Sequence, residues 1–158
     1  MVQRIATDDG ERSVLDDIAK YGWHCIYILE QDGQPPWTFT IGLFETWKHP
    51  ELVIFGLKRQ VAHEILNIVA VKLAKGERID LSQPTDDLVH GASCLLVGVP
   101  EHHYRARFGF ARWYYQGDGF PVYQIVWPNR EGYFPWNAKA PESFRSWQPV
   151  LGQMPGGA

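Results

Sequence analysis

The sequence lacks the features that mark several large classes of protein. None of its apolar runs approaches the roughly 20 residues of a membrane-spanning helix, and the opening "MVQRIATDDGERS" contains no apolar signal region. Basic residues are not in excess, since 15 Lys and Arg stand against 18 Asp and Glu for a net charge of −3. Phosphate binding needs clustered Lys and Arg. We therefore predict a cytoplasmic protein that binds neither membranes nor nucleic acid in general.

Cysteine is also scarce. The chain has 2 cysteines, Cys25 and Cys94, and each lies in an apolar, strand-like run. Thiols in such positions are more typical of small core side chains than of a disulfide. We predict that both are reduced and buried, as befits a reducing compartment.

Recognisable metal and cofactor motifs are missing. The histidines and cysteines do not show the paired, tight spacing of a structural zinc site, and the glycines form neither GxGxxG nor GxxxxGK[ST]. We predict no metal and no cofactor, although a site built from His24, His49 and a distant acid stays open.

Signatures of nucleophilic catalysis are missing as well. There is no Gly-x-Ser-x-Gly elbow. His24 and Cys25 are neighbours on a predicted strand, so their side chains point to opposite faces and cannot form a catalytic dyad. The sequence therefore identifies no catalytic residue and favours a protein that is not an enzyme.

Aromatic residues, by contrast, are abundant. The chain has 7 tryptophans in 158 residues, and 14% of its residues are aromatic. Much of this must pack the core, but Trp and Tyr keep a polar edge. A surplus of them often lines grooves and binding surfaces.

Hydrophobic periodicity predicts a single α+β domain over residues 1–158, with loose termini at 1–9 and 152–158. The predicted sheet is mainly antiparallel. Two main helices cover one face of it, and a short N-terminal helix precedes it. The predicted strands are 23–30, 37–43, 51–57, 93–100 and 120–128, with a short edge strand within 77–92 and a returning strand at 133–136. The predicted helices are 8–22, 59–75 and 101–116, the last broken near Gly109.

The order of the strands can be predicted in part. Short links make the first three strands an antiparallel meander. Val53, Ile54 and Phe55 make the third strand apolar on both faces. An edge strand seldom has this pattern, so we predict a central position for it.

Several short phrases occur in a recognisable order: "GWH", "PPWTFTIGL", "HPELVIFGL", "FARWYYQG", "FPVYQIVWP" and "FPW". In these the chain resembles the uncharacterised bacterial family known as domain of unknown function 4262, over roughly residues 10 to 137. The resemblance implies a small single-domain bacterial protein and supplies no activity. The "T-x-G-L…PEL" pattern is also loosely similar to the suppressor-of-fused type domain, which implies a protein-binding module.

The segment 36–56 contains the first candidate site. Gly42 ends the strand face that carries Thr38 and Thr40, and permits a bulge or the close approach of another group. Aromatic side chains and charged or polar side chains follow Gly42 within a few residues. They form either the rim of a binding pocket or a cap on the hydrophobic core. The candidate ligand-binding residues here are Thr40, Glu45, Trp47 and His49.

A second candidate site lies in the segment 105–115, where arginines alternate with aromatic residues. Such a mixture can bind anions or stack on flat rings. The same mixture is more typical of an amphipathic helix whose aromatic side chains are core and whose arginines are solvated. The candidate ligand-binding residues are Arg112 and Trp113.

Together these patterns predict a small cytoplasmic binding or protein-interaction domain whose partner is an unknown protein or small molecule. The alternative is an enzyme with a His/Glu/Arg pocket that acts on a small anionic or aromatic substrate. An enzyme needs polar groups that converge in a concave pocket. An interaction domain needs exposed apolar surface.

Overall fold

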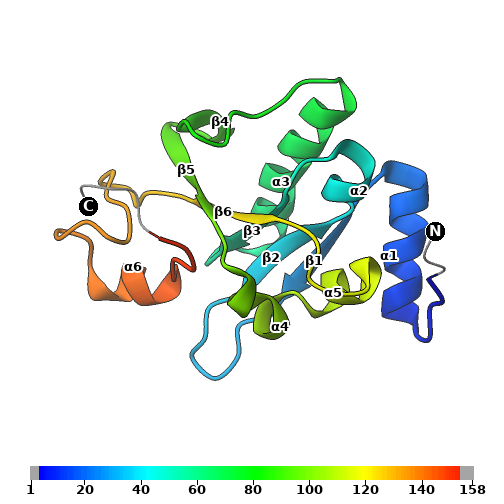
Figure 1. Cartoon of the computed structure of the whole chain (residues 1–158). Coiled ribbons are helices and arrows are strands. Elements are labelled where there is room, and N and C mark those ends of the chain that lie inside the picture. Colours follow the sequence, from blue (N-terminus) through cyan, green and yellow to red (C-terminus); the bar gives the residue numbers. More distant parts are fainter. Residues whose placement is uncertain (1–3, 154–158) are drawn as a thin grey trace.

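The computed structural model describes residues 4–153, which form one six-stranded sheet with helices on both faces (Figure 1). The strands lie in the order β1-β2-β3-β6-β5-β4. Residues 1–3 and 154–158 lie outside the described part of the chain. The predicted loose termini at 1–9 and 152–158 fall partly on these residues. The α+β fold with a mainly antiparallel sheet is as predicted from the sequence.

Three strands form the predicted antiparallel meander: β1 (His24–Ile28), β2 (Trp37–Ile41) and β3 (Glu51–Phe55). β6 (Val122–Val126) runs parallel to β3 on its other side. All five residues of β3 are buried, which confirms its predicted central position.

The far half of the sheet is antiparallel again. β5 (Ala92–Gly98) pairs with β6, and β4 (Thr85–Val89) closes the sheet at its second edge. β4 is the short edge strand expected in the polar segment after the second helix. The first edge is β1.

The two main helices cover opposite faces of the sheet, so the expectation that they share one face is wrong (Figure 1). α3 (Arg59–Ala74) packs against the face that carries Leu52 and Ile54. The opposite face, with Val53 and Phe55, is covered by α1 (Asp9–Tyr21), α4 (Tyr104–Arg107) and α5 (Gly109–Tyr115). Alternation along β3 explains this, because each apolar face needs a cover of its own.

The helical segment after β5 is interrupted as predicted. It begins with a 3-10 turn, η1 (Glu101–His103), and α4 and α5 are separated at Phe108, whose φ of −127° and ψ of 46° are not helical. Phe108 is buried in the core between the two short helices.

Two local predictions are wrong. The returning strand predicted at 133–136 is a turn, because the Asn129 and Asn137 side chains accept hydrogen bonds from the backbone N–H groups of Tyr133 and Phe134. Asx side chains stabilise turns in this way. A short helix, α6 (Glu142–Trp147), follows it. The link between the second and third strands, expected to be a turn, contains a helix, α2 (Leu43–Trp47).

Candidate functional site

Gly42 allows two parts of the backbone to meet, as its position in the sequence suggested. Its φ is +109°, and a Cβ atom built on it would lie 2.8 Å from the carbonyl oxygen of Gly22 and 3.0 Å from the Cα of Trp23. A side chain at this position would therefore collide with the connection between α1 and β1.

Glu51 is the best-connected polar side chain at this end of the sheet, and the sequence analysis missed it. It is 1% exposed. Its Oε1 accepts hydrogen bonds from Thr40 Oγ1 at 2.7 Å and Leu43 N at 3.2 Å. Its Oε2 accepts from Gly42 N at 2.9 Å, Phe44 N at 3.2 Å and the Tyr115 hydroxyl. The signal was available, since "ELVIFGL" begins a strand that is buried on both faces with an acid.

This arrangement makes Glu51 a cap for α2. Three of its five donors are the backbone N–H groups that a helix N-terminus leaves without partners. Burial raises the pKa of Glu51, whereas hydrogen bonds from Tyr115, Thr40 and the backbone act to lower it. Thr40 in turn accepts a hydrogen bond from Leu52 N at 2.9 Å. A carboxylate with all its acceptor sites occupied is a structural element here.

Glu45 lies on the outer side of the same region. Its side chain is 40% exposed, forms an ion pair with Arg4 at 2.9 Å and accepts a hydrogen bond from the Tyr114 hydroxyl. Its backbone N–H donates to the Tyr115 hydroxyl at 3.2 Å. Thr40 and Glu45 are thus linked through Glu51 and the Tyr115 hydroxyl.

His49 and Trp47 lie at the other end of α2. His49 is buried, and its Nδ1 lies 2.7 Å from the carbonyl oxygen of Pro50, so this nitrogen carries the proton and donates. Burial lowers the pKa of His49; the hydrogen bond to Pro50 opposes this, and the charge of Arg78 adds to it. Trp47 packs against the core on the α3 side.

The last two candidates lie on α5. Arg112 Nε is 2.5 Å from Asp118 Oδ1, and Trp113 packs against the core beneath α1 and α5. Among residues 4–153, no hydrogen bond or ion pair joins Glu45, His49 or Arg112 to one another. The ligand-binding role of the six candidates stays a prediction.

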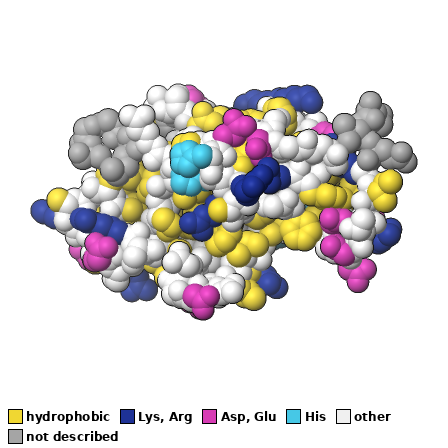
Figure 2. Space-filling view, turned by 60° about the horizontal axis from the view of Figure 1, so that its bottom comes forward, with side chains coloured by type: hydrophobic (Ala, Val, Ile, Leu, Met, Phe, Trp, Pro, Cys, Tyr) yellow, Lys and Arg dark blue, Asp and Glu magenta, His cyan; other side chains and the backbone are white. Residues whose placement is uncertain are grey.

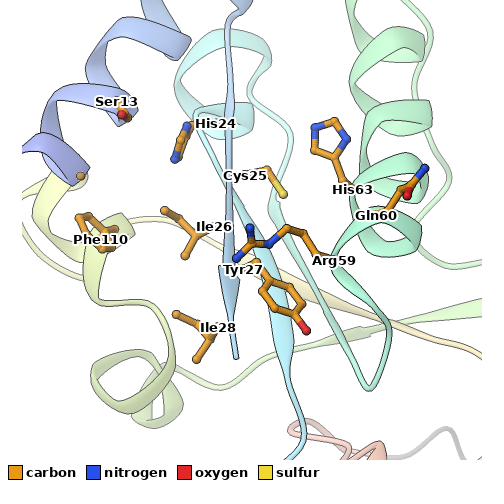
Figure 3. Close-up of a pocket in the computed structure, with 11 residues that line it drawn as sticks. Ser13, His24, Cys25, Ile26, Tyr27, Ile28, Arg59, Gln60, His63 and Phe110 are labelled. Carbon is orange, nitrogen blue, oxygen red and sulfur yellow. The ribbon is translucent and has the colours of Figure 1, made fainter. Parts of the chain in front are cut away.

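A groove of about 700 Å³ runs along β1, at the first edge of the sheet. We call it the β1 groove. Figure 3 looks onto the strand, with residues of α1 and α5 on one side and residues of α3 on the other. The lining residues are Gly10, Ser13, His24, Cys25, Ile26, Tyr27, Ile28, Arg59, Gln60, His63 and Phe110.

The two sides of the β1 groove differ in chemistry. On the α1 and α5 side, Ile26 and Ile28 belong to the apolar layer, and Phe110 packs against the same layer. On the α3 side, the Arg59 guanidinium lies over the Tyr27 ring, 4.9 Å from its centroid. Alternation along β1 creates this difference, because successive side chains point to opposite faces.

The groove holds two groups that could take part in chemistry. His24 Nδ1 is 2.7 Å from Asp17 Oδ2, and Asp17 lines an adjoining hollow of about 310 Å³ that shares His24. Burial raises the pKa of the Cys25 thiol to about 12, even though the Arg59 charge acts to lower it. Cys25 is therefore a thiol at neutral pH and a poor nucleophile.

Among residues 4–153, no three His, Cys, Asp or Glu side chains gather as metal ligands, and no helix is both long and apolar enough to cross a membrane. The fold and groove define a small α+β domain with a ligand-sized groove at one sheet edge. A family model described as "Domain of unknown function (DUF4262)" matches residues 17–141, so the chain belongs to this family. Comparison with curated proteins and with solved structures gave no match. All groove residues except Gly10 and Ser13 lie within the matched part.

Proposed function

We propose that the protein is a small cytoplasmic binding or protein-interaction domain and that its ligand lies in the β1 groove. The observation that carries the proposal is the groove itself. A volume of about 700 Å³ falls in the range of sites that hold small ligands or short segments of a partner. An apolar side with polar groups opposite it, as here, suits a site that both buries and orients a ligand.

Exposed apolar surface supports the same proposal. Figure 2 shows hydrophobic side chains in a broad band on one face of the molecule, with Lys and Arg side chains beside them. Two of the exposed large hydrophobic residues lie near β1 in the sequence: Leu29, 65% exposed, directly follows the strand, and Tyr21, 58% exposed, ends α1 and lines the adjoining hollow. Exposed apolar surface of this kind favours a binding surface.

A pair of matched variants tests the proposal. Ser13 is exposed on α1 and lines the groove, so Ser13→Trp should fill it without disturbing the core. Ala19→Trp is the control, because Ala19 is also exposed on α1 and does not line the groove. We would screen aliphatic and aromatic carboxylates and short peptides by ¹⁵N NMR.

We expect ligands to shift the resonances of β1 and of the first turn of α3. Ser13→Trp should weaken binding at least tenfold, and Ala19→Trp less than twofold. Ligands that instead shift the resonances of residues around Glu45 and Tyr114, and whose affinity is unchanged by Ser13→Trp, would overturn the groove proposal. They would favour the site predicted from Thr40, Glu45, Trp47, His49, Arg112 and Trp113.

One observation supports the alternative, an enzyme that acts on a small anionic or aromatic substrate. The Asp17–His24 pair at the groove has the geometry of a histidine oriented by a carboxylate, and Arg59, on the α3 side of the groove, supplies a positive charge for an anion. His24→Gln separates the two functions. An enzyme should keep its ligand affinity and lose turnover, whereas a binding domain has no turnover to lose.

A further inference from the structure

We infer that the β1 groove binds an extended acidic segment of a partner protein, which adds to the sheet as a further strand beside β1. The inference rests on the proposed binding function of the groove and names its ligand. Pairing of an extended peptide with an open sheet edge is a common mode of recognition, in which the backbone provides affinity and alternate side chains provide specificity.

The first argument comes from the two edges of the sheet. Natural edge strands carry charges, prolines or bulges that prevent pairing with other chains. β4 has such protection: Asp86 and Asp87 are exposed on it, and its register with β5 shifts. β1 has none. Its sequence, "HCIYI", contains no Asp, Glu, Lys, Arg or Pro, and all five residues pair in register with β2.

The second argument is that the open edge of β1 is recessed between helices. Among residues 4–153, β1 has β2 as its only neighbouring strand. Residues of α1 and α5 line one side of the groove, and those of α3 line the other (Figure 3). A flanked edge of this kind accepts a single strand and excludes broad stacking of sheets. Five residues of β1 offer pairing over about 17 Å.

The third argument is charge. Arg59 is the only charged side chain among the lining residues other than histidine, and no acidic side chain lines the groove. Among residues 4–153, Arg59 forms no ion pair. It lies in the first turn of α3, which has no acidic residue and no side-chain cap, so the helix dipole adds to its positive field. An acidic partner supplies the missing charge.

The two sides of the groove define the pattern of the segment. Side chains of an added strand would alternate between the apolar side, with Ile26, Ile28 and Phe110, and the α3 side, with Tyr27 and Arg59. The segment should therefore alternate apolar and acidic residues. A second copy of this chain fits less well, because two-fold pairing through β1 would place two Arg59 side chains on the same side of the joined sheet.

The test uses a fluorescent seven-residue peptide with valine at alternate positions, glutamate between the valines and threonine at both ends. A peptide with lysine in place of glutamate is the charge control. We would measure binding to the full chain by fluorescence anisotropy. The acidic peptide should bind at least tenfold more tightly than the basic one. Arg59→Glu should reverse this preference, and Arg130→Glu, a charge reversal at an exposed loop residue outside the groove, should leave it unchanged.

Strand pairing leaves a second signature. Alternate backbone N–H groups of an added strand point toward β1 and the others point away. Two further acidic peptides carry N-methyl groups on one alternate set or on the other. One of them should lose at least tenfold in affinity, and the other should lose less than threefold.

The outcomes separate this inference from the proposed function. Equal binding of acidic and basic peptides, or equal loss with both N-methylated peptides, would overturn strand addition. Small carboxylates that bind in a Ser13-dependent way, with no binding of the acidic peptide at 1 mM, would overturn the peptide inference and leave the groove as a small-molecule site. Self-association of the chain that Arg59→Glu abolishes would also overturn it. Failure of every probe to bind in the groove would overturn both proposals.

Discussion

At the scale of single residues, Glu51 shows how a buried carboxylate can be accommodated. Burial of a charge without partners is costly, and proteins allow it where hydrogen bonds satisfy the group. Here two hydroxyls and three backbone N–H groups point at the two carboxylate oxygens. The side chain joins the end of β2, the start of α2 and α5, which are three separate elements of the fold.

Replacing Glu51 with Gln should destabilise the protein by about 1–3 kcal/mol. An amide offers only one acceptor oxygen, so its NH₂ group must face donors that now lack a partner. Glu45→Gln is the matched control, because Glu45 is 40% exposed and exposed polar changes usually cost less than about 0.5 kcal/mol. Urea denaturation measures both. Equal effects of the two substitutions would contradict the role assigned to Glu51.

His49 should make stability depend on pH. Its pKa is lowered by burial, so below about pH 6.5 the unfolded chain binds a proton more readily than the folded chain does. The contribution of neutral His49 to the free energy of unfolding is therefore fully present above about pH 6.5. It is lost as the pH falls below 6.5 toward the lowered pKa of the folded state. The difference in unfolding free energy between wild type and His49→Asn should rise with pH between 5 and 6.5, by at most about 1.4 kcal/mol per pH unit.

The exposed His90 provides the control for this measurement. His90→Asn should change stability by less than about 0.5 kcal/mol throughout the same range. The difference in unfolding free energy between wild type and His49→Asn could instead stay flat or fall as the pH rises from 5 to 6.5. That result would show that burial does not hold His49 neutral.

At the scale of elements, the close approach at Gly42 fixes α2 against the connection between α1 and β1. The Thr46 hydroxyl donates a hydrogen bond to the Gly22 carbonyl at 2.7 Å, and Trp47 packs over Gly22. Gly22 and Gly42 both have positive φ angles, so each turn relies on a glycine. Neither turn could bring its backbone this close to the other with a side chain in the way.

Gly42→Ala should therefore cost more than a glycine substitution made at a similar φ angle in open space. Gly76 supplies the comparison: its φ is +85°, and a Cβ there has nothing within 4 Å. Both variants carry the strain of a side chain in the left-handed region, about 1–2 kcal/mol. Gly42→Ala should lose about 1–3 kcal/mol more, because the added methyl group meets backbone atoms. Thermal unfolding of the two variants compares them directly, and equal losses would contradict the close approach.

At the scale of the whole molecule, the β1 groove exists because two layers flank one edge of the sheet. α1 and α5 cover one face and α3 covers the other, and residues of both layers line the groove along β1. No single element forms it. The part of the chain matched by the family model contains the whole sheet together with α3 and α5, so most of the groove-lining residues lie within the matched part.

At this scale we predict that the chain unfolds as one domain, in a single transition in urea followed by both fluorescence and circular dichroism. The two apolar layers share the sheet, since Ile54 faces one layer and Val53 the other. Layers that share a central strand are expected to unfold together.

Local patterns were enough to predict much of this fold. Alternation and short links predicted the meander of the first three strands, because a period of two and a tight turn are properties of a few adjacent residues. The apolar pattern of β3 predicted its central position, and Gly42 indicated a bulge or a close approach, of which the structure has the close approach. Gly109 marked the interruption that falls at Phe108.

What tertiary structure alone decided depends on residues that are far apart in sequence. Tyr115 and Glu51 are 64 positions apart, and the indole of Trp127 donates to the carbonyl oxygen of Phe55 across 72 positions. No local pattern predicts which face of the sheet a helix will cover. The helical segments of α3 and α5 could therefore be predicted from the sequence, but their positions on opposite faces of the sheet could not. The β1 groove escaped the sequence analysis for the same reason: its walls come from α1, β1, α3 and α5, and only packing of the complete chain brings these elements together.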